Sequence, residues 1–353
     1  MTKALDRPPV RPAGAGARHR SWQLDVRLLG LAGVLVLLCL IGLFSSPGTF
    51  LTEGNISTML RLAAAIGVVS VGMTFVIIAG GIDLSVGSIV ALASVWMTTL
   101  ATQSYGPVVM VLCAVLVGMG CGLVNGLLIS YGKVVPFIMT LAMMASARGL
   151  AERISGRQTQ VVTETGFTDF FRGSFLGISV LVWMLALVFV VGWVVLNRTT
   201  FGRRTFAIGG NAEAARLSGI NVKLHTALVY GISGLCCGIA AIMIVARTTS
   251  GASTNGLFYE LDAIAAVVIG GTLLAGGRGS LIGTLIGVLI FTVLNSIFTQ
   301  NNLDTDIQNI AKGAIIVAAV LLQHTARSRK GKPRPSSEPD SSNTATQPSG
   351  SKS

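Results

Sequence analysis

Long apolar runs separated by short polar segments dominate this chain from residue 28 to residue 323. A membrane-spanning helix needs about 20 mostly apolar residues, and the pattern predicts ten spans. Their expected ranges are 28–44, 57–79, 84–101, 107–130, 134–150, 176–196, 224–246, 261–275, 281–299 and 307–323. Several of these runs are short or rich in glycine, and 261–275 fits a re-entrant segment as well as a span. The pattern predicts an all-α, polytopic transmembrane helical bundle.

The two ends of the chain differ in composition from this apolar region. Both are rich in Pro, Gly, Ser and charged residues, and such segments cannot bury a hydrophobic core. We expect a disordered basic N-terminal tail at 1–27 and a disordered C-terminal tail at 324–353, on either side of one transmembrane domain at 28–323. The basic leader is longer than that of a usual signal peptide, which favours an uncleaved first helix.

The distribution of Lys and Arg predicts the orientation, because cytoplasmic loops carry an excess of both. With the N-terminus inside, the cytoplasmic segments hold nineteen of these residues. The outer loops hold only Arg153, Arg157, Arg172 and Arg247. Both termini and the loop 197–223 are therefore predicted to be cytoplasmic. Three further basic residues lie near span ends, where long side chains can reach the lipid head groups: Arg61, Arg148 and Lys312.

Composition and charge exclude several other classes of protein. The chain is 52% apolar and 11% charged, with a mean hydropathy of +0.73, whereas a soluble domain carries about 25% charged residues. The net charge of +12 comes from the tails and the span ends, a distribution that suits anionic lipid rather than nucleic acid. The five cysteines lie inside apolar runs, without metal-ligand or disulfide spacing, and are interpreted as packing residues.

No sequence motif predicts a catalytic site. The phosphate-binding pattern G-x-x-x-x-G-K-[ST] is absent, so any ATP and Mg²⁺ that drive the protein bind to another chain. Residues 231–234, Gly-Ile-Ser-Gly, match the nucleophile motif of intramembrane serine proteases, but that chemistry needs a histidine at membrane depth as general base. The histidines, at 19, 225 and 324, lie in tails or at span ends. Ser233 is interpreted as a residue that packs or bonds to the preceding helical turn.

Few ionisable residues lie near membrane depth, where each costs at least about 2.5–3.5 kcal/mol. Asp83, Glu260 and Asp262 stand at span mouths, and no relay of carboxylates connects them. A proton- or sodium-coupled carrier would need such a relay. Helix N-capping is the favoured interpretation of Asp83 and Asp262, and substrate contact is the alternative.

Glycines are placed at helical spacing in two of the predicted spans. The two sets are Gly118, Gly122 and Gly126, and Gly279, Gly283 and Gly287. Small residues let helix backbones approach closely in a membrane, so both sets predict packing within the subunit, with a pore lining as the alternative. In addition, 77–92 and 268–285 both run from an apolar helix through a Gly-Gly break to another helix. They are either an internal repeat, as in many transporters, or independent turns of a simple kind.

The polar loop 197–223 is longer than a connection between two spans requires. We predict a turn followed by a short helix from Asn211 to Ser218, ended by Gly219. Asn211 is the expected N-cap, and Glu213 in the first turn suits the helix dipole. An ordered amphipathic element at this position indicates a docking surface for a cytoplasmic partner.

At this loop the chain resembles a known family. GRRTFAIGGNAEAARLSGI (202–220) is similar to the cytoplasmic loop of the ribose-type permeases of ATP-binding-cassette importers. Three other stretches, AGGIDLSVGS (79–88), VVPFIMTLAMMASARGLA (134–151) and YELDAIAAVVIGGTLLAGGRGSLIGTLIG (259–287), resemble the same family in the same order. The sequence departs from the pattern at Ala142, at Phe206 and at 274–276, which leaves the subfamily and the sugar open.

The resemblance implies a membrane permease subunit, without enzymatic activity of its own, that passes a ribose-like pentose or a hexose through the bacterial inner membrane. The implied partners are a cytoplasmic ATPase, a periplasmic or lipid-anchored sugar-binding protein, a second identical or similar permease, and membrane lipid. A secondary carrier for a small neutral solute is the alternative. The expected ATPase-coupling residues are Gly202, Arg203, Arg204, Gly209, Gly210, Asn211, Ala214, Ala215, Ser218 and Gly219. The candidates for the translocation path or gate are Asp83, Ser85, Asn125, Pro136, Phe137, Thr140, Glu260, Asp262 and Asn295.

Overall fold

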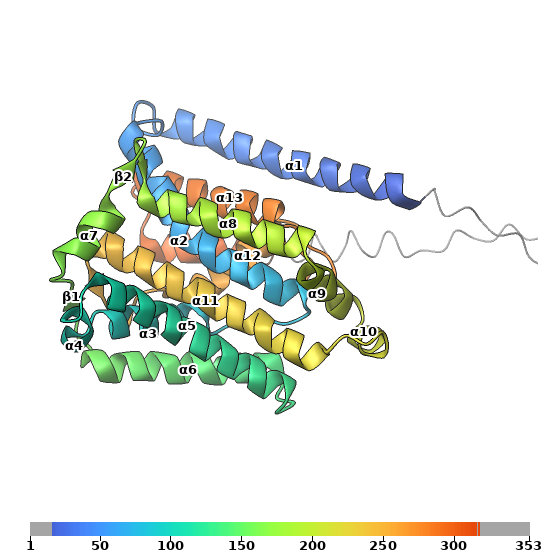
Figure 1. The fold of residues 1–353 in the computed structure, drawn as a ribbon. Helices are drawn as coiled ribbons and strands as arrows, with labels where there is room; N and C mark the ends of the chain where they lie inside the picture. Colours follow the sequence, from blue (N-terminus) through green and yellow to red (C-terminus); the bar gives the residue numbers. More distant parts are fainter. Residues whose placement is uncertain (1–15, 316, 318–353) are drawn as a thin grey trace, which may run out of the picture.

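The computed structural model describes residues 16–315 and 317, which form a bundle of helices that run side by side (Figure 1). The long helices are α1 (Gly16–Ser45), α2 (Glu53–Ile78), α5 (Pro107–Ser130), α6 (Pro136–Ser155), α8 (Val180–Arg198), α11 (Val222–Thr248) and α13 (Leu281–Gln300). The short ones are α3 (Val86–Met97), α4 (Leu100–Gln103), α7 (Thr165–Arg172), α9 (Thr200–Gly210), α10 (Ala212–Leu217) and α12 (Tyr259–Ile269). A further helix runs from 305 through the last described residues.

Four two-residue strands complete the described structure. β1 (Gln160–Val161) pairs with β4 (Ser250–Gly251), and β2 (Ser174–Phe175) pairs with β3 (Ile178–Ser179), both antiparallel. These strands and α7 lie at one end of the bundle, and α9 and α10 lie at the opposite end (Figure 1). The two polar connections that the sequence assigns to opposite membrane faces are therefore at opposite ends of the molecule.

Among the described residues, six helices are long and apolar enough to cross a membrane: the part of α1 from Leu28 to Ser45, α2, α5, α8, α11 and α13. They match six of the ten predicted spans, and the protein is a polytopic helical membrane protein. The helix α6 matches the span predicted at 134–150 in length, but it carries Arg148, Glu152 and Arg153. The helix that begins at 305 corresponds to the start of the last predicted span.

Two predicted spans are shorter than expected. The range 84–101 contains α3, of 12 residues, and α12, of 11 residues, covers only part of 261–275. At 1.5 Å per residue these helices reach about 18 Å and 16 Å, roughly half the thickness of the hydrocarbon layer. Both are bounded by glycine: Gly80 precedes α3, and Gly271 follows α12, each with a positive φ that ends a helix readily. Hydrophobicity alone overestimated their length because it does not register these breaks.

The first helix begins earlier than predicted. α1 starts at Gly16, so the part of the expected disordered tail from 16 to 27 is helical. Residues 1–15 and the predicted C-terminal tail, 324–353, lie outside the described residues.

Helix α11 lies at the centre of the bundle and packs against α5, α2 and α3. Its contact with α5 is made by backbone atoms. A Cβ added at Gly118 would lie 2.7 Å from the Gly238 nitrogen, and one at Gly122 would lie 2.9 Å from the Gly234 Cα. A Cβ at Gly126 would lie 2.6 Å from the Ala227 Cα. The glycine set predicted on this span therefore packs within the subunit, as the sequence analysis favoured.

The second glycine set behaves in the same way, with one correction. Gly283 and Gly287 on α13 press against Gly270 and Ala266, at the end of α12. Gly279 is not part of this stripe, because α13 begins at Leu281. It lies in the preceding loop, where an added Cβ would meet the side chain of Ile78.

This packing predicts a sharp difference between two neighbouring glycines of α5. A Leu side chain at Gly122 would overlap the carbonyl oxygen of Tyr230, whereas no atom lies within 4 Å of a Cβ at Gly120. We expect Gly122→Leu to lower stability by about 1–3 kcal/mol, the usual cost of overpacking, and Gly120→Leu to have little effect. Thermal melting and membrane yield of the purified variants measure this. Equal behaviour of the two variants would refute the packing role of Gly122.

Candidate coupling segment and translocation site

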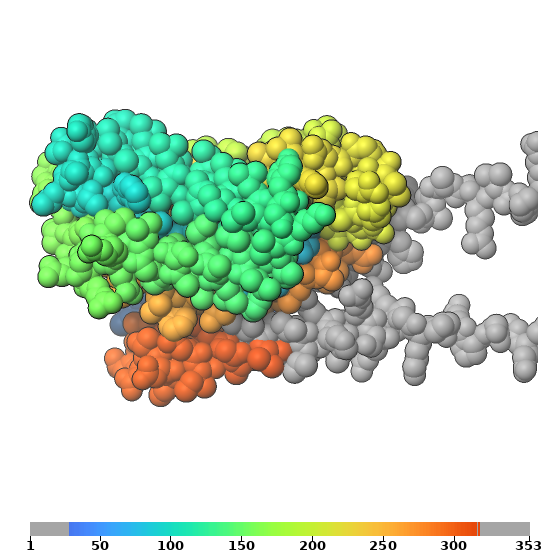
Figure 2. Space-filling view, turned by 90° about the horizontal axis from the view of Figure 1, so that it is seen from below, coloured from blue at the N-terminus to red at the C-terminus, as the bar shows by residue number. Residues whose placement is uncertain are grey.

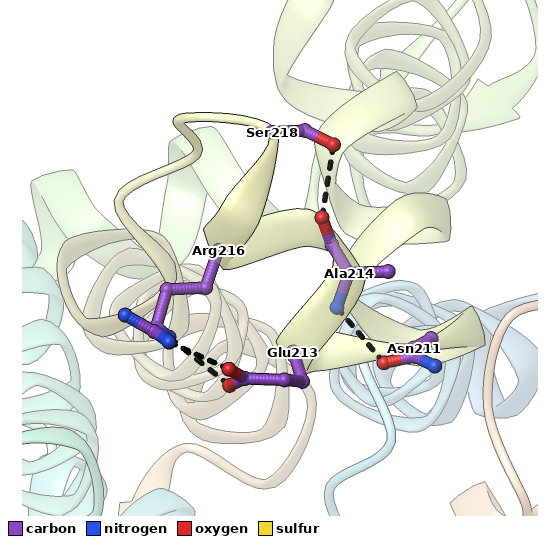
Figure 3. Close-up of polar contacts among 5 residues, drawn as sticks. All are labelled: Asn211, Glu213, Ala214, Arg216 and Ser218. Atoms are coloured by element: carbon purple, nitrogen blue, oxygen red, sulfur yellow. Dashed lines mark hydrogen bonds and ion pairs between the residues drawn. The ribbon is translucent and has the colours of Figure 1, made fainter.

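The segment 200–220 is more ordered than the sequence predicted. Residues 200–210, expected as a turn, form the helix α9, which begins at the N-cap Thr199. The following short helix is as predicted: the Asn211 side chain accepts a hydrogen bond from the Ala214 nitrogen at 3.0 Å, and Gly219 follows with φ +82°. Figure 3 shows this cap together with the ion pair on the same helix. Thr199 thus caps the start of α9, and Asn211 alone separates the end of α9 from the start of α10.

Helix α10 presents a mixed polar and apolar surface. Arg216 donates hydrogen bonds to Glu213 from Nε at 3.0 Å and from Nη2 at 2.6 Å (Figure 3). This bond lowers the pKa of Glu213 below its ordinary value, although both side chains are exposed and the gain in stability is small. Leu217 is 74% exposed, whereas Ala215 is only 4% exposed. The exposed apolar surface of this helix therefore centres on Leu217, and Ala215, expected among the coupling residues, belongs to the protein interior.

Helix α9 is fixed to the bundle by its buried face. Thr205 Oγ1 lies 2.8 Å from His225 Nε2 of α11, and the ring of Phe201 lies 4.2 Å from that imidazole. At Gly202, an added Cβ would overlap the backbone of Leu196 in α8. Arg203 and Arg204 point outward and are exposed. Figure 2 shows this yellow end of the molecule, with α9, α10 and the start of α11, as an open surface. The expected coupling residues are therefore divided: Arg203, Arg204 and Ala214 are exposed, whereas Gly202 and Ala215 are buried.

A cluster of buried polar side chains lies where α2 ends and α3 begins. Asp83 is fully buried, and its Oδ1 accepts hydrogen bonds from the nitrogen and Oγ of Ser85, at 3.0 and 2.5 Å. Its Oδ2 accepts one from Ser233 Oγ of α11 at 2.9 Å. Asn125 Nδ2 of α5 donates to Ser85 Oγ at 2.9 Å. Three of the predicted path residues therefore lie together: Asp83 and Ser85 in the segment between α2 and α3, and Asn125 on α5.

The geometry corrects the roles predicted for two of these residues. The residue at the N-cap position of α3 is Ser85, so Asp83 is not the cap. It instead joins the break between α2 and α3 to α11. Ser233 does not bond to its own preceding turn, because its hydroxyl is directed at Asp83. One turn earlier on the same face of α11, Tyr230 Oη donates to the Ile82 oxygen at 3.2 Å. Tyr230 and Ser233 are three residues apart and share a face of α11. From the sequence, this spacing could have indicated that both side chains bond to the same segment, here residues 82 and 83.

The other charged candidates lie around the short helix α12. Asp262 is not an N-cap, because it lies within the first turn of α12, which begins at Tyr259. It pairs with Lys312 of the last described helix, at 3.4 Å between Oδ1 and Nζ. Lys312 therefore points inward rather than to lipid. Because the two side chains are only 11% and 18% exposed, removing either partner would leave a poorly solvated charge.

Glu260 and Arg148 form a second polar region near the start of α12. The Glu260 carboxylate packs against Gly87 in the first turn of α3, and its Oε2 is buried without a hydrogen-bond partner among the described residues. Arg148 of α6, expected to reach the head groups, instead donates to the backbone oxygens of Ser253 and Asn255. Its side chain thus holds the segment between α11 and α12.

The remaining path candidates are not part of either cluster. Pro136 occupies the first position of α6, Phe137 is exposed on the same helix, and Thr140 is buried and donates to the Pro136 oxygen at 3.0 Å. Asn295 lies on α13, and its Oδ1 is buried without a hydrogen-bond partner in the described part of the chain. The nine predicted residues are therefore divided among at least three places in the bundle.

Comparison with known proteins assigns the chain to a family. Residues 55–320 match the family described as branched-chain amino acid transport system / permease component. The chain belongs to this family. The permease is 44% identical to the ribose import permease protein RbsC of Bacillus subtilis over 292 residues, which are 82% of this chain and 90% of that protein.

Two other relatives are named for different sugars. The permease is 38% identical to the L-arabinose ABC transporter permease protein AraH of Azospirillum brasilense, over 92% of this chain and 95% of that protein. It is 37% identical to the galactose/methyl galactoside import permease protein MglC of Escherichia coli, over 85% of this chain and 95% of that protein. The predicted resemblance to ribose-type permeases is confirmed.

The Asp83 cluster leads to a prediction about proton coupling. If Asp83 is a structural acceptor, Asp83→Asn should keep most of the uptake rate, because the amide oxygen can still accept from Ser85. Asp83→Leu should lower stability, since each buried donor left without a partner costs about 1–3 kcal/mol. Uptake in proteoliposomes and thermal melting test both variants. Complete loss of uptake in a well-folded Asp83→Asn would instead indicate a carboxylate that carries a proton.

Proposed function

We propose that this chain is the permease subunit of an ATP-binding-cassette importer that passes a small sugar, a ribose-like pentose or a hexose, through the bacterial inner membrane. The likeness to import permeases named for ribose, arabinose and galactose, over most of both chains, carries the proposal. The family description names amino acids, but each of these three relatives is named for a sugar. They do not favour the secondary-carrier alternative.

In this proposal the chain contributes ten membrane segments, with both termini and α9–α10 in the cytoplasm. The nineteen-to-four distribution of Lys and Arg supports this orientation. So does the placement of α9–α10 and α7 at opposite ends of the bundle, with α1 beginning at the same end as α9 (Figure 1). The short helices α3 and α12 end inside the membrane, as discontinuous helices do in other transporters.

The work of transport is divided among several chains. A binding protein outside the membrane delivers the sugar, and a separate cytoplasmic subunit binds ATP and Mg²⁺. A second permease, identical or similar, completes the path. The polar groups near α3 and α12, including Asp83, Ser85, Asn125, Glu260 and Asp262, are the candidates for lining or gating it. No residue of the permease needs to react chemically, because the sugar crosses unchanged.

The surface of α10 is the proposed docking site for the ATPase. Leu217 provides one large exposed apolar side chain, and the exposed Ala212 and Ala214 leave space around it. Such an arrangement suits a short helix in a groove, where single central residues contribute much of the binding energy. Arg203 and Arg204 are placed to meet acidic groups on the partner, with lipid head groups as their alternative contact.

Sugar uptake is the direct test of the proposed function. The permease would be co-expressed with its ATPase and reconstituted in proteoliposomes, with the binding protein and labelled ribose, arabinose, galactose or leucine. We expect ATP-dependent accumulation of one of the sugars and none of leucine. Accumulation of leucine would transfer the proposal to amino acids, and accumulation of a sugar by the permease alone without ATP would replace it with a secondary carrier.

The docking surface has its own test. Leu217→Arg should abolish co-purification of the ATPase, because a charge replaces the apolar side chain at the centre of the contact. Leu100→Arg is the matched control, since Leu100 is 78% exposed on α4 at the opposite end of the bundle. Both variants should insert and fold normally. Unchanged co-purification in Leu217→Arg would rule out α10 as the docking surface.

A further inference from the structure

Three pairs of glycines from distant parts of the chain meet at the end of α9. They are Gly80–Gly81 after α2, Gly209–Gly210 at the end of α9, and Gly276–Gly277 between α12 and α13. A Cβ at Gly209 would overlap the Ile78 oxygen and lie 2.6 Å from the Gly277 nitrogen. A Cβ at Gly276 would lie 2.9 Å from both the Gly209 oxygen and the Gly80 Cα. We call this contact of the three pairs the glycine junction.

The glycine junction joins the two segments that the sequence showed to be alike, 77–92 and 268–285. The Gly277 nitrogen donates to the Ile78 oxygen at 2.9 Å, so the two breaks are bonded directly. Gly80, Gly276 and Gly277 have φ of +87°, +81° and +72°, which side chains of L-residues rarely allow. Glycine at these positions therefore does more than end a helix, because it also lets the two breaks and the end of α9 come into backbone contact.

Each break is next to one of the short helices in the chain: α3 follows Gly80–Gly81, and α12 precedes Gly276–Gly277. After Gly80, the chain is held to α11 by Tyr230 at Ile82 and by Ser233 at Asp83, and α3 starts at Val86. After Gly277, the chain enters α13, whose Gly283 and Gly287 press against Gly270 and Ala266 of α12. A displacement of the end of α9 thus reaches α3 and α12 through backbone contacts and buried hydrogen bonds.

We infer that Gly209 is a positioning residue for transport, through which a movement of α9 and α10 is passed to the short helices α3 and α12. The inference rests on the proposed docking of the ATPase at α10. Contacts between backbones have no side-chain rotamers that could absorb a displacement, and close-packed interiors transmit strain. The junction is the place where the segment exposed to the partner touches both breaks directly.

The neighbouring glycine provides a matched control. No atom lies within 4 Å of a Cβ at Gly210, whereas a Cβ at Gly209 must push the three pairs apart. In the complex with the ATPase and the binding protein, we expect Gly209→Ala to fold with a lowered melting temperature, because its Cβ overlaps backbone atoms, and still to co-purify with the ATPase through α10. Its substrate-stimulated hydrolysis and sugar uptake should fall about tenfold, within the usual range of coupling between sites. Gly210→Ala should behave like the wild type.

The outcomes separate this inference from the proposed function. If the wild-type complex transports sugar and Gly209→Ala transports equally well, the inference is wrong and the proposed function stands. If Gly209→Ala folds but loses the ATPase, Gly209 belongs to the docking surface and the inference is also wrong. If the variant does not fold, Gly276→Ala replaces it, because its Cβ would press on Gly209 and Gly80 with a smaller overlap, at 2.9 Å from the Gly209 oxygen. Normal coupling in a folded Gly276→Ala would then overturn the inference.

Discussion

Close contact between helix backbones, made possible by glycine, is the interaction on which this structure depends. Helices in a membrane gain little from the hydrophobic effect between one another, so their association relies on dispersion forces and hydrogen bonds at short distance. Helix α11 meets α5 through Gly118, Gly122, Gly234 and Gly238, with no side chain between the two backbones. This contact fixes the central helix, and the positions of its polar side chains follow from it.

The fixed position of α11 determines where its buried polar side chains form hydrogen bonds. Because α11 is held in place, Tyr230 and Ser233 face the break between α2 and α3 and bond to Ile82 and Asp83. The same helix binds α9 through His225. A carboxylate as deeply buried as Asp83 persists only with hydrogen-bond donors around it. The buried polar side chains thus add specific hydrogen bonds between α11, α9 and the segment that joins α2 to α3.

The arrangement also relates the surface of the protein to its interior. Helix α10 exposes Leu217 and the ion pair between Glu213 and Arg216, whereas α9 buries its opposite face against α8 and α11. The end of α9 then touches both helix breaks at the glycine junction. The exposed helix α10 and the tightly packed end of α9 are therefore next to each other in the chain.

The sequence by itself determined the class of the protein, the long apolar helices, the opposite placement of the polar loops and the caps of α10. These features depend on local patterns: apolar length, charge at span ends, and an Asn followed by a short helix and Gly219. The family resemblance was also readable, because four motifs occur in order. Glycine spacing correctly predicted close packing on α5, since residues four apart share a helix face.

Only the tertiary structure decided which distant residues meet. Asp83 and Asp262 looked alike as caps, yet one binds Ser233 of α11 and the other pairs with Lys312. Arg148 and Lys312 looked like residues for the lipid surface, and both turn inward. Ala215 looked available to a partner and is buried. Hydrophobic periodicity shows that a face is covered but not what covers it. Long-range pairing and the meeting of three Gly-Gly pairs were therefore beyond the sequence alone.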